Sequence, residues 1–171
     1  MSGYRLEKKH HLSSVLEQDL NKSGFHYNVI NASVAGDTSA GGLNRIKWTL
    51  SESSIEILVL CLGANDMLRG IKPDATKKNL EKIIKITLNK KIKIIFAGMI
   101  APKSYGDNYK NAFDAMYLSL SKEYNLNYIP FLLDGVALNP DLNLNDGIHP
   151  NEKGVIVISK TILRQIKKII K

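Results

Sequence analysis

The chain alternates between short runs of consecutive apolar residues and longer stretches in which apolar residues recur every three or four positions. Short apolar runs predict buried strands, whereas the wider spacing predicts the apolar face of a helix. The run over residues 55–62 is almost entirely apolar, which is typical of a strand buried on both faces of a parallel sheet. On this basis we predict strands over residues 27–32, 55–62, 92–99 and 128–131.

Helices are predicted over the intervening segments, at residues 7–22, 40–50, 73–89, 108–124 and 152–170. The last has an apolar face and carries its basic residues mostly elsewhere. Such a helix can lie on a membrane surface, but at the end of a domain it more often docks on a sheet. Because strands and helices alternate, we predict an α/β fold, a three-layer α/β/α domain with a parallel sheet. Without repeats or linkers, residues 1–171 are predicted to form a single domain.

The composition adds a strong positive charge to this picture. The net charge is +8, which would permit a nucleic-acid or anionic-membrane partner. The lysines are scattered through the predicted helices, however, and the chain is rich in isoleucine and asparagine as well, as a compositional bias would produce. It has no basic stripe interleaved with aromatic residues of the kind that binds single strands. We therefore expect no nucleic-acid partner.

Cysteine content and hydropathy exclude two further classes of protein. The single cysteine, Cys61, lies in an apolar run, so neither a disulfide framework nor a cysteine-rich metal site is possible, and an inert core thiol is expected. No apolar run approaches the roughly 18 residues that span a membrane, and the first residues show no signal-peptide pattern. We expect a soluble protein without stable membrane insertion, in the periplasm or the cytoplasm, and a lost signal peptide is compatible with this.

Three polar turns carry the candidate chemistry, around Gly36, Asn65 and His149. Sites of parallel α/β folds form beyond the carboxyl ends of the strands, so these turns are expected to converge there. Asp146 precedes His149 by three residues in a tight turn, which can bring a carboxylate next to the imidazole. In a catalytic triad, that carboxylate fixes the tautomer of an imidazole acting as general base. An isolated Asp-x-x-His sequence is weak support, because most such pairs are surface loops.

The three turns resemble, in order and spacing, three conserved blocks of the SGNH (GDSL-type) hydrolases. The matching stretches are Ala32-Ser33-Val34-Ala35-Gly36-Asp37-Thr38, Leu62-Gly63-Ala64-Asn65-Asp66 and Asp146-Gly147-Ile148-His149-Pro150. The closest resemblance is to the bacterial thioesterase/lysophospholipase/arylesterase branch, and it extends over nearly the whole chain. It implies a flavodoxin-like parallel sheet. It also implies hydrolysis of carboxylic esters or thioesters of short- to medium-chain acyl groups through a Ser-His-Asp triad.

The resemblance also implies roles for individual residues. His149 would be the general base and Asp146 its orienting partner, while the backbone N–H of Gly36 and the side-chain amide of Asn65 would donate to the oxyanion. These residue types suit the task, because a tetrahedral intermediate needs donors aimed at its oxyanion. Glycine lets a backbone N–H approach closely, and asparagine offers an uncharged donor. Each residue alone would be explained as a turn former or a cap; only the ordered set favours function.

Neighbouring residues qualify the match. Asp37 and Asp66 are expected to hold their turns through hydrogen bonds from side chain to backbone. Ala64 stands where the family commonly has a second glycine, so a slightly altered turn is expected before Asn65.

The family's first block has no counterpart in this sequence. That block is a strand ending in Gly-Asp-Ser-Leu, which supplies the nucleophilic serine and a third oxyanion donor, and no Gly-Asp-Ser occurs here. In this branch it precedes a stretch like Ser2-Gly3-Tyr4-Arg5, so we expect the first strand and the nucleophile to be missing from the chain as given. Neither Ser2, which has no strand to position it, nor Thr38 is expected to substitute. Without its nucleophile a triad retains only residual activity.

Two explanations of this gap remain open. In the first, Met1 is an internal methionine of a longer, ordinary hydrolase. In the second, the chain is a non-catalytic descendant that binds acyl or lipid-like ligands. Retention of His149, Asp146, Asn65 and Gly36 favours the first.

The expected partner is a small acyl ester or thioester. Apolar residues near the predicted site are candidates for its acyl pocket, although they would serve equally as core: Met67, Leu68, Ile71, Met99, Ile100, Tyr105 and Phe131. This chemistry needs no metal or organic cofactor, and no His/Asp cluster has the spacing of zinc ligands. The sequence specifies neither the oligomeric state nor the physiological substrate.

Overall fold

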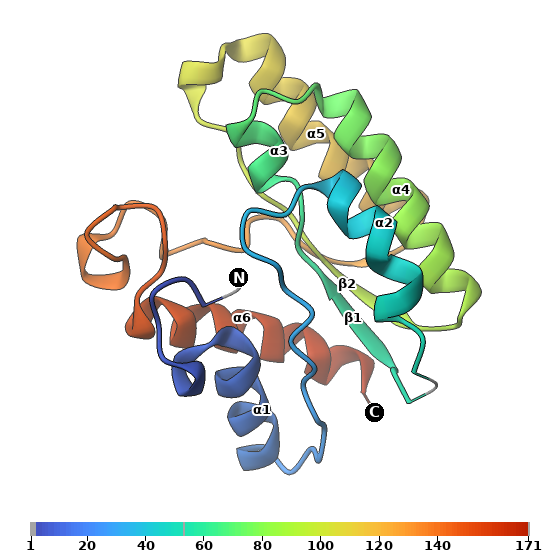
Figure 1. The fold of residues 1–171 in the computed structure, drawn as a ribbon, viewed down its shortest axis with the longest axis vertical. Helices are drawn as coiled ribbons and strands as arrows, with labels where there is room; N and C mark the ends of the chain where they lie inside the picture. The colour runs from blue at the N-terminus through green and yellow to red at the C-terminus, as the bar shows by residue number, and fades with distance from the viewer. Residues whose placement is uncertain (1–2, 53, 171) are drawn as a thin grey trace. The chain divides into compact units, whose positions relative to one another are not determined.

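A computed structural model describes residues 3–52 and 54–170 (Figure 1). The chain forms two compact units, each described below by itself. Unit 1 consists of Met1–Ala35 and Leu132–Lys171, and unit 2 consists of Gly36–Phe131. The single domain expected over residues 1–171 stays a prediction.

The described part of unit 2 contains a parallel sheet of three strands in the order β1-β2-β3. The strands are β1 (Ile57–Leu60), β2 (Lys93–Ala97) and β3 (Asn127–Ile129). In register, Leu58 lies opposite Ile94 and Phe96 lies opposite Tyr128. All residues of β2 after Lys93 are buried, which explains the apolar run in the sequence. The predicted fold class is confirmed: three parallel strands are flanked by helices.

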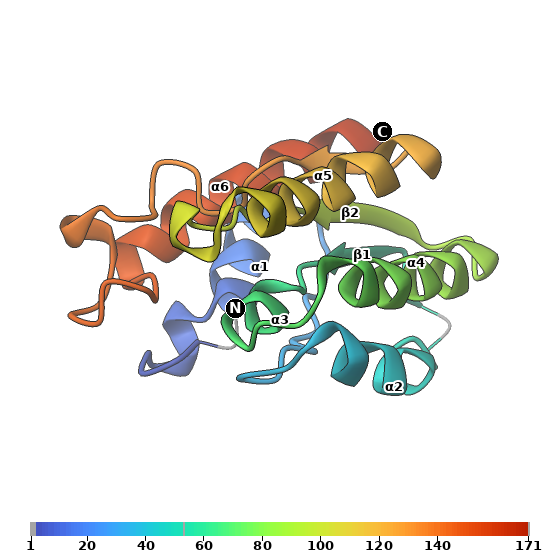
Figure 2. The same cartoon turned by 90° about the horizontal axis from the view of Figure 1, so that it is seen from above.

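The described helices of unit 2 are α2 (Ser39–Thr49), α3 (Ala64–Leu68), α4 (Pro73–Asn89) and α5 (Asp107–Glu123), with a 3₁₀ turn η2 (Lys103–Tyr105). Helices α2, α4 and α5 follow the predicted segments closely, whereas α3 was not predicted. The bounds of α4 agree with the prediction because Pro73 occupies the first turn, where its missing N–H is not needed. Helix α2 packs beside α4 (Figure 2). Its Trp48 points outward and is 80% exposed.

A cluster of packed aromatic side chains from β2 and α5 fixes the position of the residues just before α3. Phe96 of β2 and Phe113 of α5 each lie 5.5 Å from the ring of Tyr117, and all three side chains are fully buried. The Tyr117 hydroxyl donates to the carbonyl of Leu62 at 2.9 Å. It also fills the space beside Gly63, where a Cβ would lie 2.2 Å from the hydroxyl oxygen. Gly63 has φ +114°, so both conformation and space require glycine where α3 begins.

Unit 1 is built around two packed helices, α1 (Leu12–Lys22) and α6 (Glu152–Ile169), which lie side by side in Figure 1. The 3₁₀ turns η1 (Lys8–His10) and η3 (Pro140–Leu142) accompany them. The apolar face of α6 is buried, and Ser159 donates to Asp19 of α1 at 2.7 Å. That face is therefore already covered and does not present a membrane-binding surface. Within the described residues, no helix combines the length and apolarity needed to cross a membrane.

The strand predicted over residues 27–32 is not present in the structure. Side chains from Tyr27 to Ile30 alternate between half-buried and exposed, as they would in a strand with one covered face. A strand also needs a ladder of backbone hydrogen bonds with a neighbour, and alternation does not supply one. The backbone N–H of Val29 instead donates to the Glu17 carboxylate of α1 at 2.6 Å.

Candidate active site

The predicted pair of Asp146 and His149 forms a compact hydrogen-bonded turn in unit 1. The imidazole Nδ1 lies 2.9 Å from Asp146 Oδ2. The other carboxylate oxygen, Oδ1, accepts the backbone N–H groups of Ile148 and His149, each at 2.9 Å. Gly147 adopts φ +68°, a conformation that glycine tolerates without strain. Residues 146–149 thus fold into the contact between carboxylate and imidazole that the sequence suggested.

These hydrogen bonds keep the Asp146 carboxylate ionised. The backbone N–H of His149, then that of Ile148, then the imidazole stabilise the carboxylate and lower the pKa of Asp146 to about 2. An ionised carboxylate only accepts hydrogen bonds, so Nδ1 must carry the hydrogen that it donates. In the neutral imidazole this leaves the lone pair on Nε2, which is the arrangement of a general base.

The base of this turn is tied to its surroundings. Asn143 and Pro150 form an antiparallel bridge, and the N–H of Leu144 donates to the carbonyl of His149 at 2.7 Å. Asn143 is buried, and its amide donates to the carbonyls of Val136 at 2.6 Å and Asn139 at 2.7 Å. The turn is therefore anchored by its own backbone and by a buried amide.

Tyr4 packs on the imidazole of His149, a contact that the sequence did not reveal. The ring centroids are 4.5 Å apart with an interplanar angle of 34°. The Arg5 guanidinium lies 5.1 Å from the centroid of the Tyr4 ring. A turn closed by a bond from Leu6 N–H to the Gly3 carbonyl carries Tyr4, and His11 hydrogen-bonds the Leu6 carbonyl at 3.1 Å. The only signal in the sequence was the family-like stretch that contains Tyr4.

In unit 2 the other two predicted residues, Gly36 and Asn65, belong to a loop and a helix that are bonded to each other. Asn65 lies in α3, and its side-chain amide donates to the carbonyl of Asp37 at 2.9 Å. Gly36 has φ +71°, which explains why glycine stands there. Its carbonyl accepts a hydrogen bond of 2.7 Å from the guanidinium of Arg69, the residue that follows α3.

A buried carboxylate connects the same loop and helix. Asp66 is fully buried and accepts the backbone N–H of Ser39 at 2.8 Å, the Ser39 hydroxyl, and the Thr76 hydroxyl at 3.1 Å. Asp66 thus binds a backbone N–H, but that of the loop leading into α2 and not that of its own turn, where the expectation placed it. Asp37 instead pairs with Arg45 of α2, with 2.8 Å between Oδ2 and Nε.

The seven residues predicted as candidates for an acyl pocket all belong to unit 2, but their exposure differs, with Ile71 and Met99 half-buried. Met67 is a core residue with 7% exposure, whereas Leu68 and Ile100 are 57% and 43% exposed. Tyr105 and Phe131 are half-buried, and the ring of Tyr105 lies 5.4 Å from that of Tyr109. Their assignment to a substrate pocket stays a prediction.

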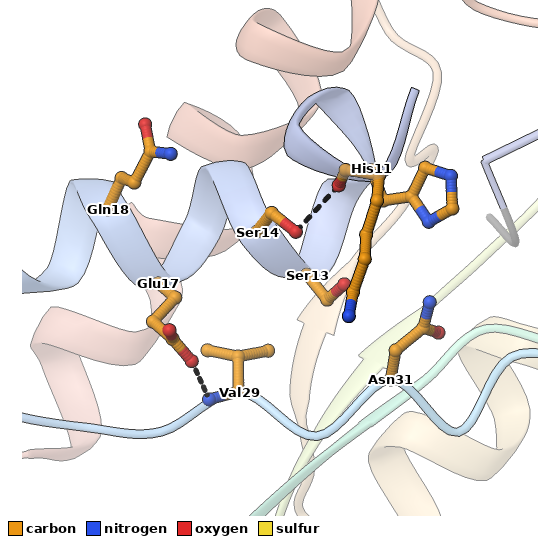
Figure 3. A pocket seen from close by; sticks show the side chains of 8 residues that line it. His11, Ser13, Ser14, Glu17, Gln18, Val29 and Asn31 are labelled. Atoms are coloured by element: carbon orange, nitrogen blue, oxygen red, sulfur yellow. Dashed lines mark hydrogen bonds between the residues drawn. The ribbon is translucent and has the colours of Figure 1, made fainter. Parts of the chain in front are cut away.

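Unit 1 has a cavity of about 420 Å³ between α1 and residues 29–31 (Figure 3). Its lining is mostly polar: Lys8, His11, Ser13, Ser14, Glu17, Gln18, Val29 and Asn31. None of the predicted pocket residues is among them, and an acyl chain requires a mainly apolar wall.

Four further features concern the chemistry of the site: the two alternative nucleophiles, a possible metal cluster and the single cysteine. Ser2, considered as a substitute nucleophile, lies outside the described residues. The hydroxyl of Thr38 caps α2 by accepting the N–H of Gly41 at 3.3 Å. Within residues 3–52 and 54–170, no group of three or more His, Cys, Asp or Glu residues is placed to hold a metal ion. Burial raises the pKa of the Cys61 thiol, as expected for an inert thiol.

Comparison with known proteins adds sequence and structural relatives. Residues 1–155 match the GDSL-like Lipase/Acylhydrolase family. Esterase TesA of Pseudomonas aeruginosa is 36% identical over 137 residues, which cover 80% of this chain and 68% of the relative. Thioesterase 1/protease 1/lysophospholipase L1 of Escherichia coli is 33% identical over 142 residues, covering 83% and 68%. An arylesterase of Vibrio mimicus is 29% identical over 167 residues, covering 98% and 84%.

The structural comparison agrees with the sequence comparison. A crystal structure of TesA superimposes with a TM-score of 0.92 and 30% sequence identity, covering 99% of this chain and 94% of the other.

Proposed function

The chain belongs to the GDSL-like lipase/acylhydrolase (SGNH) family, and we propose that it hydrolyses short- to medium-chain carboxylic esters or thioesters through His149 and Asp146. It is an SGNH hydrolase of the esterase, thioesterase and lysophospholipase kind. The observation that carries the proposal is the 2.9 Å contact between His149 Nδ1 and Asp146 Oδ2, which directs the Nε2 lone pair to proton transfer.

The proposed reaction has two steps. In the first, a serine hydroxyl gives its proton to His149 Nε2 while its oxygen bonds to the substrate carbonyl carbon. The imidazolium, stabilised by ionised Asp146, then returns that proton to the departing alcohol or thiol. In the second step, water attacks the acyl-enzyme with Nε2 again as the base, and the serine leaves protonated. No metal or organic cofactor takes part in the proposed reaction.

The oxyanion donors in the proposal are the backbone N–H of Gly36 and the amide of Asn65. One hydrogen of the Asn65 amide is used by the Asp37 carbonyl, so the other remains for the oxyanion. The described residues provide no acceptor for the Gly36 N–H. Loss of one such donor typically reduces the rate by about 10²–10³.

The nucleophile is proposed to be a serine in a Gly-Asp-Ser segment ahead of Ser2, as the family resemblance places it. The 171 residues contain no such segment. The alternative left open by the sequence, in which these residues bind acyl ligands without turnover, is the second candidate function.

The experiment uses the protein purified from its own cells. Its intact mass is compared with 19.1 kDa, and it is treated with a fluorophosphonate, whose site of attachment is mapped. We expect a larger mass, labelling of a Gly-Asp-Ser serine, and ester hydrolysis that His149→Ala abolishes. A protein of 19.1 kDa that binds acyl ligands without labelling would support the second candidate. Hydrolysis that is unchanged in His149→Ala would contradict the roles given to His149 and Asp146.

A further inference from the structure

Short helix α3 and the residue after it contact the loop of residues 36–39 at three points. The Arg69 guanidinium holds the carbonyl of Gly36, and the Asn65 amide holds the carbonyl of Asp37. The Asp66 carboxylate accepts the N–H of Ser39. Nearly every residue of this loop is thus bonded to a side chain from one short segment.

The contact from Arg69 stands apart from the other two. Asp66 is fully buried and Asn65 is half-buried, whereas Arg69 is exposed. Among the described residues no carboxylate pairs with Arg69. A guanidinium on a protein surface can hydrogen-bond to water in many orientations. The 2.7 Å hydrogen bond from Arg69 to one backbone carbonyl therefore calls for an explanation.

The backbone of Arg69 is held in place for this contact. Its N–H closes α3 by donating to the carbonyls of Asn65 and Asp66, both at 3.2 Å. Gly70 then adopts φ +66°, and the N–H of Ile71 returns to the carbonyl of Asp66 at 2.9 Å. This left-handed closure is a common helix end, and it fixes the point from which the guanidinium extends.

We propose that Arg69 is a positioning residue: by holding the carbonyl of Gly36 it fixes the peptide plane between Gly36 and Asp37, and with it the Cα next to the donor N–H of Gly36. The inference rests on the proposed oxyanion role of Gly36. Glycine at φ +71° has few steric barriers, so its peptide planes rotate easily unless an external group restrains them. A hydrogen-bond donor for an oxyanion must be preorganised, because reorientation during the reaction forfeits its benefit. Arg69 supplies the restraint that the glycine lacks.

The position of Arg69 has a kinetic consequence. The oxyanion exists only in the transition state and the tetrahedral intermediate, so a misplaced donor lowers kcat and leaves KM nearly unchanged. We expect Arg69→Met to lower kcat about tenfold to a hundredfold, which is less than complete loss of a donor. Arg69→Lys keeps a donor and the charge, and it should recover most of the rate.

The test measures kcat and KM of Arg69→Met, Arg69→Lys and His149→Ala, made in the natural gene and purified from the same cells. The matched control is Arg164→Met, which removes an exposed arginine of α6 whose guanidinium hydrogen-bonds the Thr161 hydroxyl at 3.1 Å. In parallel, the amide resonances of Gly36 and Asp37 are recorded by NMR for the 171-residue chain and its Arg69 variants. We expect Arg69→Met alone to shift or broaden these resonances, while those of the core stay unchanged.

The outcomes separate this inference from the proposed function. Unchanged kcat and unchanged Gly36 resonances in Arg69→Met, with activity lost in His149→Ala, would overturn the positioning role and leave the hydrolase assignment intact. A tenfold rise in KM with unchanged kcat would also overturn it, because it would make Arg69 a substrate-binding group. Retention of activity in His149→Ala would contradict the proposed function itself.

Discussion

The two parts of the candidate site are built in opposite ways. In unit 1, Asp146 and His149 lie within one turn, and both side chains are partly exposed. In unit 2, Asp37 of the Gly36 loop and Asn65 lie 28 positions apart in the sequence, and a hydrogen bond joins them. The fully buried carboxylate of Asp66 binds the N–H of Ser39 in the same loop. The first part depends on the hydrogen bonds of a single turn. The second part is inseparable from the packing of its unit.

This difference predicts how each part fails on mutation. Surface substitutions outside special contacts usually change stability by less than about 0.5 kcal/mol. Removal of a buried hydrogen-bonding group instead leaves its partners unsatisfied, which costs about 1–3 kcal/mol for each. Substitutions at His149 should therefore affect mainly the reaction, and substitutions at Asp66 should affect the fold as well.

The largest effect is expected for His149→Ala in the protein made by its own cells. Loss of the general base should lower kcat by about 10⁴-fold or more, because triad residues act as a unit. The urea midpoint, followed by circular dichroism, should fall only slightly, because the substitution removes the ring contact with Tyr4 and one hydrogen bond of Asp146 but leaves the backbone hydrogen bonds of the turn. The control His26→Ala removes an exposed histidine of the same unit and should preserve kcat. A large stability loss in His149→Ala would show that the two parts do not differ in the way described.

The next largest effect is expected for Asp66→Ala. It leaves the Ser39 N–H, the Ser39 hydroxyl and the Thr76 hydroxyl without their acceptor. The free energy of unfolding should fall by about 3 kcal/mol or more, since each unsatisfied buried donor costs about 1–3 kcal/mol. Urea unfolding measures this loss. Asp74→Ala, at the exposed start of α4, is the control and should lose only about 0.3–1 kcal/mol.

A pH-dependent effect should distinguish the turn of unit 1. The pKa of Asp146 lies at about 2 in the folded protein, below its ordinary 3.8. Folding therefore gains stability from the ionised carboxylate at neutral pH, and this gain is lost as the pH falls through that window. Compared with Asp146→Asn, the wild type should have the higher urea midpoint at neutral pH, and the two should converge near pH 2. A difference in urea midpoint that stays constant between neutral pH and pH 2 would contradict the ionic origin of the stabilisation. Asp134→Asn, at an exposed position, is the control.

The smallest effect is expected at Tyr4. Aromatic pairs contribute about 0.5–1.5 kcal/mol beyond their burial, which corresponds to roughly twofold to tenfold in rate. Tyr4→Leu should therefore lower kcat by about that factor, since it removes the ring that packs on His149. Tyr4→Phe keeps the ring and should keep the rate. An equal loss in both variants would assign the effect to the hydroxyl group instead of to ring packing.

The sequence predicted best those features that depend on neighbouring residues. Asp146 and His149 were paired correctly because four consecutive residues suffice to form their turn. The bounds of α4 were predicted because Pro73 and a regular apolar spacing are local signals. The apolar runs around β1 and β2 gave the parallel sheet, although each strand proved shorter than its run.

Contacts between distant segments could not be predicted. Helix α3 was missed because it has only five residues, too few to display helical spacing, and because its polar side chains face a loop that lies elsewhere in the sequence. Tyr4 was missed because nothing near it in the sequence indicates a histidine at its face. The strand over residues 27–32 was predicted in error because the residues of one segment do not show whether a neighbouring strand is there to pair with it.

The exposed position of Trp48 has a practical consequence for spectroscopy. It is the sole tryptophan in the sequence, and its indole on α2 is 80% exposed. Its fluorescence should already resemble that of indole in water, so unfolding should change the emission wavelength very little. The same property makes Trp48 a sensitive reporter of a different event. A blue shift of its emission would show that another molecule had covered the outer face of α2 while the protein stayed folded.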